Sequence, residues 1–234
     1  ACYQWQYARQ FTIYNDVVYI ADTYGRKVKS LTLTGQCKDI WFTGQQPHAI
    51  AANSNYVFVG YPSNSITFLD HRLNERTTQN INSNYLIYSW GMSINPAGNK
   101  LAIADYNKNH VVEFSISGDR LTYTRKTSST YSSGNGYFQR PTDTGYDSNG
   151  NIYVTDLYAH RVQKFNSSLV YQSKVGSYST SSGFRYPYGM YVDSNDKIYA
   201  TDFYNYAVRQ YDTSLSETAT YGGGAGTRLS AAKK

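Results

Sequence analysis

The sequence is poor in the residues that mark the commonest enzyme chemistries. Its 234 residues include two cysteines, four histidines and five prolines. It contains no Ser-centred nucleophile elbow, no phosphate-binding loop and no His-Glu-x-x-His zinc motif. No apolar run approaches the roughly 18–20 residues that span a bilayer. We therefore expect a protein that is not an enzyme, needs no cofactor or metal ion, and does not insert into a membrane.

Acidic residues are also scarce relative to basic ones. The chain has 16 acidic and 22 basic residues, which gives a net charge of +6 and a pI near 9.1. This balance permits contact with an anionic partner. The basic residues are spread along the chain, and no block of them forms the kind of arm that binds nucleic acid. Nucleic acid is therefore a less favoured partner, although the composition does not exclude it.

The two cysteines, Cys2 and Cys37, allow one intramolecular disulfide bond. A bridge closing a loop of this size would stabilise a fold by about 3–4 kcal/mol in the chain-entropy picture. Two buried thiols are the alternative. The chain begins Ala1-Cys-Tyr-Gln-Trp5, as a mature secreted chain or a trimmed one would, and Asn166-Ser-Ser168 is an N-glycosylation sequon. Together these features predict a secreted, extracellular protein with a disulfide bond and a glycan at Asn166.

Tyrosine, by contrast, is abundant: there are 26, and aromatic residues make up 16% of the chain. Since Tyr favours half-buried pleated surfaces, the excess indicates an all-β protein. The stretch 149–165 has the two-residue alternation of two strands joined by a hairpin. Its first strand recurs every 38 to 51 residues, as Val18–Asp22, Tyr56–Gly60, Leu101–Asp105, Ile152–Asp156 and Ile198–Asp202. A period of about 40–50 residues made of short strands predicts the four-stranded antiparallel blades of a β-propeller.

The last two units contain a more specific pattern. The fourth has Gly134–Phe138, Pro141, Asp147, Gly150–Val154, Asp156 and His160–Val162 in succession, and the fifth has Gly183-Phe184, Pro187–Gly189, Asp193, Ile198-Tyr199, Asp202 and Val208. This succession resembles an NHL repeat. The other three units match it in part, and Gly60 stands where the second unit should have the recurrent Asp. The resemblance implies an NHL-type β-propeller.

NHL-type chains usually form six blades, whereas five repeats are present here. We expect one domain over residues 1–226, with blades at about 8–43, 44–82, 87–127, 138–176 and 184–222, and a C-terminal tail over 223–234. Three arrangements satisfy the count: a five-bladed ring, which we favour, a six-bladed ring completed by the termini or a partner, and an open arc. The segment Cys2–Tyr7 is a candidate latch against the last unit.

Aromatic residues provide the strongest functional signal. Each expected hairpin carries a tyrosine just past the recurrent Asp or Gly, and in a propeller these hairpins share one face with the loops that enter the inner strands. The candidate binding face comprises Tyr24, Tyr61, Tyr106, Tyr158 and Tyr204, with Trp90, Tyr188 and His48 nearer the channel. Tyrosine offers a large rigid surface with a hydroxyl group, which suits glycans, peptides or another subunit. The alternative is that each tyrosine packs on its own hairpin.

The recurrent aspartates raise the question of metal binding. We expect Asp22, Asp105, Asp156 and Asp202 to accept backbone hydrogen bonds in their own hairpins, because one per blade spreads them around the ring. The peptidyl-hydroxyglycine amidating lyases, propellers similar to NHL repeats, place zinc-binding histidines at the position of His48 in several blades. The matching positions here are Gln10, Trp90, Thr142 and Tyr188. One imidazole does not make a zinc site, so we expect no metal site.

We therefore predict a secreted, non-enzymatic binding or assembly module that uses the tyrosine-rich face. Its partner would be a protein or a glycan, or further copies of the same subunit. One alternative is an RNA-binding NHL-type domain using Arg26, Lys27, Lys108, Arg161 and Arg209. Another is a lyase or hydrolase with a site in the channel.

Overall fold

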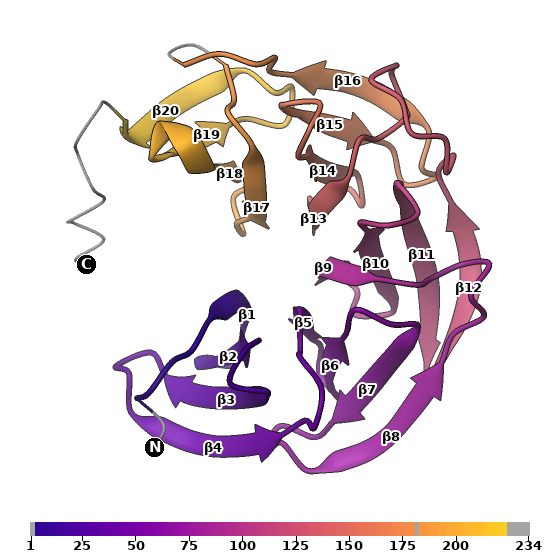
Figure 1. Cartoon of the computed structure of the whole chain (residues 1–234), viewed down its shortest axis with the longest axis vertical. Helices are drawn as coiled ribbons and strands as arrows, with labels where there is room; N and C mark the ends of the chain where they lie inside the picture. Colours follow the sequence, from indigo (N-terminus) through magenta and orange to yellow (C-terminus); the bar gives the residue numbers. More distant parts are fainter. Residues whose placement is uncertain (1–2, 181–182, 224–234) are drawn as a thin grey trace.

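The computed structural model describes residues 3–180 and 183–223, which form five sheets of four antiparallel strands around a common axis (Figure 1). We number the sheets as blades 1 to 5. Their strands are β1(Ala8–Tyr14), β2(Val17–Asp22), β3(Lys27–Thr32) and β4(Cys37–Phe42); β5(Ala49–Ala52), β6(Val57–Gly60), β7(Ser65–Leu69) and β8(Glu75–Asn80); β9(Ser89–Ile94), β10(Lys100–Asp105), β11(His110–Ser117) and β12(Arg120–Lys126); β13(Pro141–Tyr146), β14(Ile152–Asp156), β15(Arg161–Phe165) and β16(Tyr171–Val175); β17(Pro187–Val192), β18(Ile198–Asp202), β19(Ala207–Tyr211) and β20(Glu217–Gly222). The predicted propeller of five four-stranded blades is confirmed.

Helical structure plays almost no part in the described residues. It is limited to one 3-10 turn, Phe203–Asn205, in the hairpin between β18 and β19. No helix in this part of the chain is long and apolar enough to cross a membrane.

Each second strand of an interior blade contributes to the cores on both of its sides. In blade 4, Ile152 and Val154 of β14 pack with Ala102 of blade 3, whereas Tyr153 packs with Ile198 of blade 5. This division follows from the two-residue period of a strand, which sends alternate side chains to opposite faces of the sheet. The cores of the propeller therefore lie between blades, and each blade depends on its neighbours for burial.

A buried aspartate at the end of the second strand organises the hairpin in four of the blades. In blade 4, Asp156 accepts a hydrogen bond from the Gln139 backbone N–H at 2.7 Å and pairs with Arg161 at 2.9 Å. Asp202 does the same in blade 5 with the Arg185 N–H and Arg209. The carboxylate thus ties the hairpin to the loop that enters the same blade, which satisfies donors that would otherwise be buried and unpaired.

Blade 2 lacks the buried aspartate at the end of its second strand. The alignment of the five repeats from the sequence is wrong by one residue in this blade. The backbone N–H of His48 bonds to the Gly60 carbonyl oxygen, so that Ala49 pairs with Gly60 and Tyr61 occupies the position of the recurrent Asp. Tyr61 is 2% exposed, and its hydroxyl donates to Thr67 Oγ1 at 3.1 Å. The expectation that Gly60 replaces the Asp is therefore wrong.

The five blades form an arc that leaves blades 1 and 5 apart (Figure 1). The inner strands pack in the order β1–β5–β9–β13–β17. Blade 1 and blade 5 are linked at the channel by a hydrogen bond from Arg9 to the Tyr188 hydroxyl. Their facing sheets stay open, with Phe11 60% and Tyr191 57% exposed. Of the three arrangements considered for ring closure, the described residues correspond to the open arc of five blades.

The N-terminal segment lies over blade 1 rather than against the last blade. The backbone N–H groups of Gln6 and Tyr7 donate to Asp22, and the ammonium group of Lys29 lies 3.9 Å from the centre of the Trp5 ring. The described part of the predicted latch therefore does not reach blade 5. The backbone N–H of Cys37 lies 3.4 Å from the Tyr3 hydroxyl. Cys2 is outside the described residues, so the Cys2–Cys37 disulfide stays a prediction.

Candidate binding face

One end of the propeller is formed by the hairpins between the second and third strands and by the loops that lead into the first strands. We call this end the tyrosine face; it comprises residues 22–27, 60–65, 105–110, 156–161 and 202–207 of the hairpins and 3–9, 43–48, 81–90, 127–140, 176–180 and 183–186 of the loops. The antiparallel order of the strands brings all of these segments to the same end. This arrangement agrees with the one expected from the repeat.

Four of the five predicted hairpin tyrosines lie on this face with at least part of the ring exposed. Tyr24, Tyr158 and Tyr204 are 59%, 43% and 46% exposed, and Tyr106 is half-buried. Tyr61 does not belong to the group because it is buried between blades 1 and 2. Its inclusion among the candidates is a consequence of the register error in blade 2.

The residues expected near the channel do come together at the centre of the face. The Trp90 ring stacks on Tyr106 with 4.1 Å between ring centres, and it meets His48 edge-on at 5.6 Å. Tyr188 lies 5.9 Å from Trp90. Strands from blades 2, 3 and 5 supply these side chains, so the cluster is a product of the tertiary arrangement.

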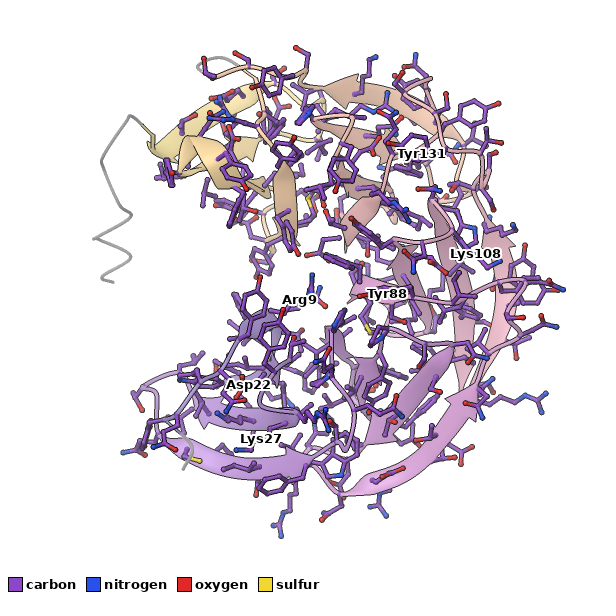
Figure 2. The ribbon with its side chains drawn as sticks, in the orientation of Figure 1. Arg9, Asp22, Lys27, Tyr88, Lys108 and Tyr131 are labelled. Carbon is purple, nitrogen blue, oxygen red and sulfur yellow. The ribbon has the colours of Figure 1, made fainter. Side chains whose placement is uncertain are left out.

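Arg9 completes this cluster, and the sequence analysis missed it. Its guanidinium carbon lies 3.6 Å from the centre of the Trp90 ring, and the group bonds to the Tyr188 hydroxyl. Figure 2 shows Arg9 and Tyr88 near the centre of the view, with Lys27 and Lys108 farther out. Arg9 is the extra residue where the register between β1 and β2 shifts from Ala8 to Gln10, as Trp90 and Thr142 are in blades 3 and 4, so the expected match of Gln10 to this position is wrong by one residue.

A second aromatic cluster lies on the blade 4–blade 5 side of the face. Tyr186 meets Tyr158 at 5.9 Å and Tyr204 at 5.3 Å, in both cases edge-to-face. The Tyr186 backbone N–H donates to His160 Nδ1. Arg140 and Tyr186 each precede the proline that opens an inner strand, and both have a positive φ, of 66° and 60°. An aromatic or basic residue directly before Pro141 and Pro187 is the sequence feature from which these two positions could have been predicted.

The charges on the tyrosine face have one sign at its surface. The partly or fully exposed cations are Arg9, Arg26, Lys27, Lys108, Arg140 and Arg185. The acidic residues in the same segments are Asp22, Asp105, Asp156 and Asp202, and all four are buried. The opposite end carries both signs in or beside its turns: the acidic residues Asp16, Asp70, Glu75, Asp119, Asp193, Asp196 and Asp212, and the basic residues Arg72, Lys100, Arg120 and Lys197. The two ends of the propeller thus differ in the charge they present to a partner.

The four buried aspartates act as structural acceptors. Asp105 takes hydrogen bonds from the backbone N–H groups of Ile87, Tyr88, Asn107 and Lys108. In the described part of the chain, no group of three or more His, Cys, Asp or Glu side chains is arranged to hold a metal ion. These carboxylates are occupied by their own hairpins, in line with the structural role expected for them.

His48 lies against the guanidinium group, with its Nδ1 3.5 Å from Arg9. Burial, with a further contribution from the positive charge of Arg9, lowers the pKa of His48 to about 4. The imidazole is therefore neutral near pH 7. It supplies a hydrogen-bonding group to the cluster and no second positive charge.

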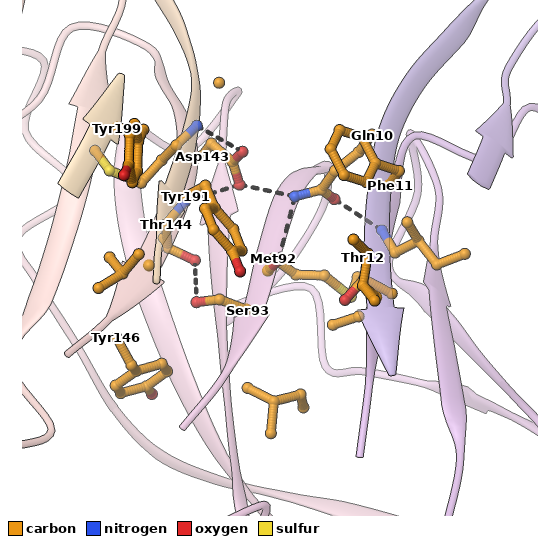
Figure 3. Close-up of a pocket in the computed structure, with 18 of the residues that line it drawn as sticks. Gln10, Phe11, Thr12, Met92, Ser93, Asp143, Thr144, Tyr146, Tyr191 and Tyr199 are labelled. Carbon is orange, nitrogen blue, oxygen red and sulfur yellow. Dashed lines mark hydrogen bonds between the residues drawn. The ribbon is translucent and has the colours of Figure 1, made fainter. Parts of the chain in front are cut away.

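Below the mouth, the channel contains a cavity of about 470 Å³ that is lined by all five inner strands. Gln10 lies across it: its Oε1 accepts from the Ile50 N–H, and its Nε2 donates to the Met92 carbonyl oxygen and to Asp143 (Figure 3). Asp143 also accepts from the Met190 N–H at 3.0 Å. One network therefore joins the inner strands of all five blades.

The comparisons with known proteins agree with this architecture. The family model for the NHL repeat matches residues 138–165, which are the connecting loop and first three strands of blade 4. The chain is a five-bladed β-propeller that contains an NHL repeat. No curated protein sequence matches it.

Several solved structures resemble this NHL-repeat propeller in fold. They include virginiamycin B lyase from Staphylococcus aureus, with a TM-score of 0.68 and 13% identity over 92% of this chain and 69% of the lyase. A streptogramin B lyase has a TM-score of 0.70 at 11% identity, over 94% of this chain and 70% of that one. A chain of a nidogen/laminin complex has a TM-score of 0.69 at 16% identity, over 88% and 76%. At these identities the likeness concerns the fold alone.

Two further sequence predictions concern Asn166 and the arginines considered for RNA binding. Asn166 lies in the turn between β15 and β16, where its side-chain oxygen accepts from the backbone N–H groups of Ser168 and Val170. Glycosylation there stays a prediction.

Arg161 and Arg209, considered for RNA binding, are buried in ion pairs with Asp156 and Asp202. They are occupied inside their blades, which removes two of the five residues proposed for that function.

Proposed function

We propose that the protein is a non-enzymatic, extracellular binding module whose tyrosine face contacts a protein or glycan partner. The observation that carries this proposal is the composition of that face. It has exposed tyrosines on three blades and cations on four, and within the described residues its carboxylates are all buried. Aromatic rings beside guanidinium groups and polar loops are typical of the centres of binding surfaces.

The nidogen/laminin neighbour supports a protein partner, because that structure is a complex of two proteins. The lyase neighbours support the enzymatic alternative. Against it, the channel mouth contains one histidine, His48, which is neutral and held between Arg9 and Trp90. The fold hosts unrelated activities, so the site rather than the fold decides between these functions.

A binding experiment with a matched control tests the proposal. The wild-type protein is applied to an array of extracellular glycans and to immobilised matrix proteins, including laminin. The face variant carries Tyr24→Ala, Tyr158→Ala and Tyr204→Ala, and the control variant removes exposed apolar residues in turns at the opposite end, Leu33→Ala and Val170→Ala. We expect the face variant to lose at least about tenfold in affinity, about 1.4 kcal/mol, and the control to bind as wild type. Equal binding by all three proteins, or no binding by wild type, would contradict the proposal.

Self-assembly is a second candidate, and the open ends of the arc favour it. Phe11 and Tyr191 are the most exposed members of the two facing inner strands. Large exposed apolar side chains on an unpaired sheet are typical of association sites. Size-exclusion chromatography with light scattering measures this directly, and a strict monomer at millimolar concentration would remove this candidate.

A further inference from the structure

The guanidinium group of Arg9 is held over the channel mouth without a counter-ion. Its planar face packs on Trp90 at 3.6 Å, and its terminal nitrogens contact the Tyr188 hydroxyl and His48 Nδ1. In the described part of the chain Arg9 forms no ion pair, and its Nε is buried without a hydrogen-bond partner. We call Arg9, Trp90, Tyr188 and His48 the axial site.

The surroundings of the axial site leave the positive charge uncompensated. His48 is neutral near pH 7, and burial raises the pKa of Tyr88 and Tyr188. The one carboxylate in the channel, Asp143, is engaged by Gln10 and by backbone N–H groups. A partly buried charge without a partner is costly, and an anion that accepts from the remaining N–H groups of the terminal nitrogens offsets that cost.

The packing of Trp90 restricts which anion fits. Arg9 covers one face of the indole and Tyr106 covers the other at 4.1 Å, so neither face is open to a nucleic-acid base. Sequence-tolerant binding of single strands depends on such open aromatic faces. What the axial site does present is a guanidinium donor between the Tyr188 hydroxyl and the neutral imidazole of His48. This combination fits an oxyanion attached to a hydroxyl-rich, non-planar group.

The other cations of the face are spaced rather than clustered. Lys27 lies on blade 1, Lys108 on blade 3, and Arg140 and Arg185 in the loops entering blades 4 and 5. Arg140 lies over the Tyr106 ring at 4.8 Å, and Arg185 over the Tyr204 ring at 5.3 Å. Apart from the adjacent Arg26 and Lys27, the cations are single and lie on different blades. They match a polymer that carries one carboxylate per sugar unit, since a pyranose ring can pack on an exposed tyrosine while its carboxylate meets the guanidinium.

From this geometry we propose that the tyrosine face binds an acidic polysaccharide, with a uronate carboxylate held by Arg9 in the axial site. The proposal rests on the proposed function of the face and names its ligand class. Bidentate binding of a carboxylate is the interaction for which the planar guanidinium is suited, so lysine at position 9 would substitute for it poorly. Binding should weaken as the salt concentration rises, because the ligand and the face are oppositely charged.

Isothermal titration calorimetry with oligogalacturonate tests the proposal, with neutral galactan as the uncharged control. We expect binding of oligogalacturonate alone, a loss of at least about tenfold in affinity in Arg9→Gln, and a partial loss in Arg9→Lys. Arg120→Gln, in the turn between β11 and β12 at the opposite end, is the matched control and should bind as wild type. Circular dichroism and thermal unfolding establish that each variant is folded.

The remaining outcomes separate the inference from the function on which it rests. If Arg9→Gln retains full affinity while the triple tyrosine variant loses it, the axial site is not used but the face is, and only the inference fails. Equal binding of galactan, or tighter binding of a homopolymeric RNA than of oligogalacturonate, also overturns the inference. Failure of the wild type to bind any glycan or protein tested would overturn both.

Discussion

The interior and terminal blades carry similar residues at equivalent positions but bury them to different extents. Tyr153 of β14 is fully buried between blades 4 and 5, whereas Tyr199, its counterpart on β18, is half-exposed at the open end of the arc. Ile103 of β10 and Ile20 of β2 differ in the same way. The comparison shows that a blade's sequence specifies its sheet, while the neighbouring blade determines how much of that sheet is buried.

The ion pairs between aspartate and arginine in the hairpins should contribute similarly to stability in interior and terminal blades. Asp156 pairs with Arg161 in interior blade 4, and Asp202 pairs with Arg209 in terminal blade 5, with both arginine side chains 5% exposed or less. Replacing Asp156 by asparagine leaves Arg161 without its counter-ion, and replacing Asp202 leaves Arg209 with only Glu217 at 3.2 Å, whose side chain is 37% exposed. We expect Asp156→Asn and Asp202→Asn each to lower the free energy of unfolding by about 3–5 kcal/mol, measured by urea denaturation. A much smaller loss in blade 5 would contradict this expectation and would mean that Glu217 replaces Asp202 as the partner of Arg209.

Replacement of Tyr153 and of Tyr199 should affect stability differently, because the first lies in an interior blade and the second in a terminal one. Tyr153→Ala removes a ring packed on both sides and a hydroxyl bonded to Asp147 and to the Thr213 carbonyl oxygen. We expect it to cost about 3–5 kcal/mol, as for other buried aromatic residues, and Tyr199→Ala to cost about 1 kcal/mol. Both variants are compared by urea denaturation at one protein concentration. Equal losses would show that the open side of blade 5 is covered in solution.

The hydrogen-bond network in the channel joins the inner strands of interior and terminal blades. Its Asp143 should therefore make the stability of the propeller depend on pH. Burial raises the pKa of Asp143 to about 7, and hydrogen bonds from Met190, Thr144 and Gln10 only partly oppose the shift. Since the folded state binds this proton more tightly than the unfolded chain, the resulting stabilisation is complete below about pH 4 and is lost as the pH rises through about 7. In the wild type, the free energy of unfolding should decrease between pH 4 and pH 8. We expect Asp143→Asn to make that decrease smaller by on the order of 2 kcal/mol. Asp119→Asn, in an exposed turn, serves as the control and should leave the profile unchanged.

Features determined within one repeat could be predicted from the sequence, whereas others could not. The strands, the hairpins and the role of Asp156 were predictable because they follow from two-residue periodicity and turn chemistry within one repeat. The register of blade 2 was not, because 56–61 is apolar or small throughout and gives no alternation to fix it. A shift of one residue exchanges the two faces of a strand, which is why Tyr61 was assigned to the surface when it belongs to the core.

The candidate site was predicted only in part for the same reason. Tyr24, Tyr158 and Tyr204 follow the repeat, so the pattern placed them. Arg9 lies on blade 1 and Trp90 on blade 3, and their contact exists only because the arc brings both inner strands to one channel. No periodicity within a repeat encodes a contact between repeats.

The smallest expected effect concerns the open side of blade 1. Phe11 is 60% exposed, whereas Ile50, its counterpart on β5, is buried against blade 1. Phe11→Ser should change the free energy of unfolding by less than about 0.5 kcal/mol, as for other exposed side chains, while Ile50→Ala should cost about 2–4 kcal/mol. The measurement is urea denaturation at low and high protein concentration. If Phe11→Ser destabilises the protein only at high concentration, another molecule covers this sheet, because stability gained by association depends on protein concentration.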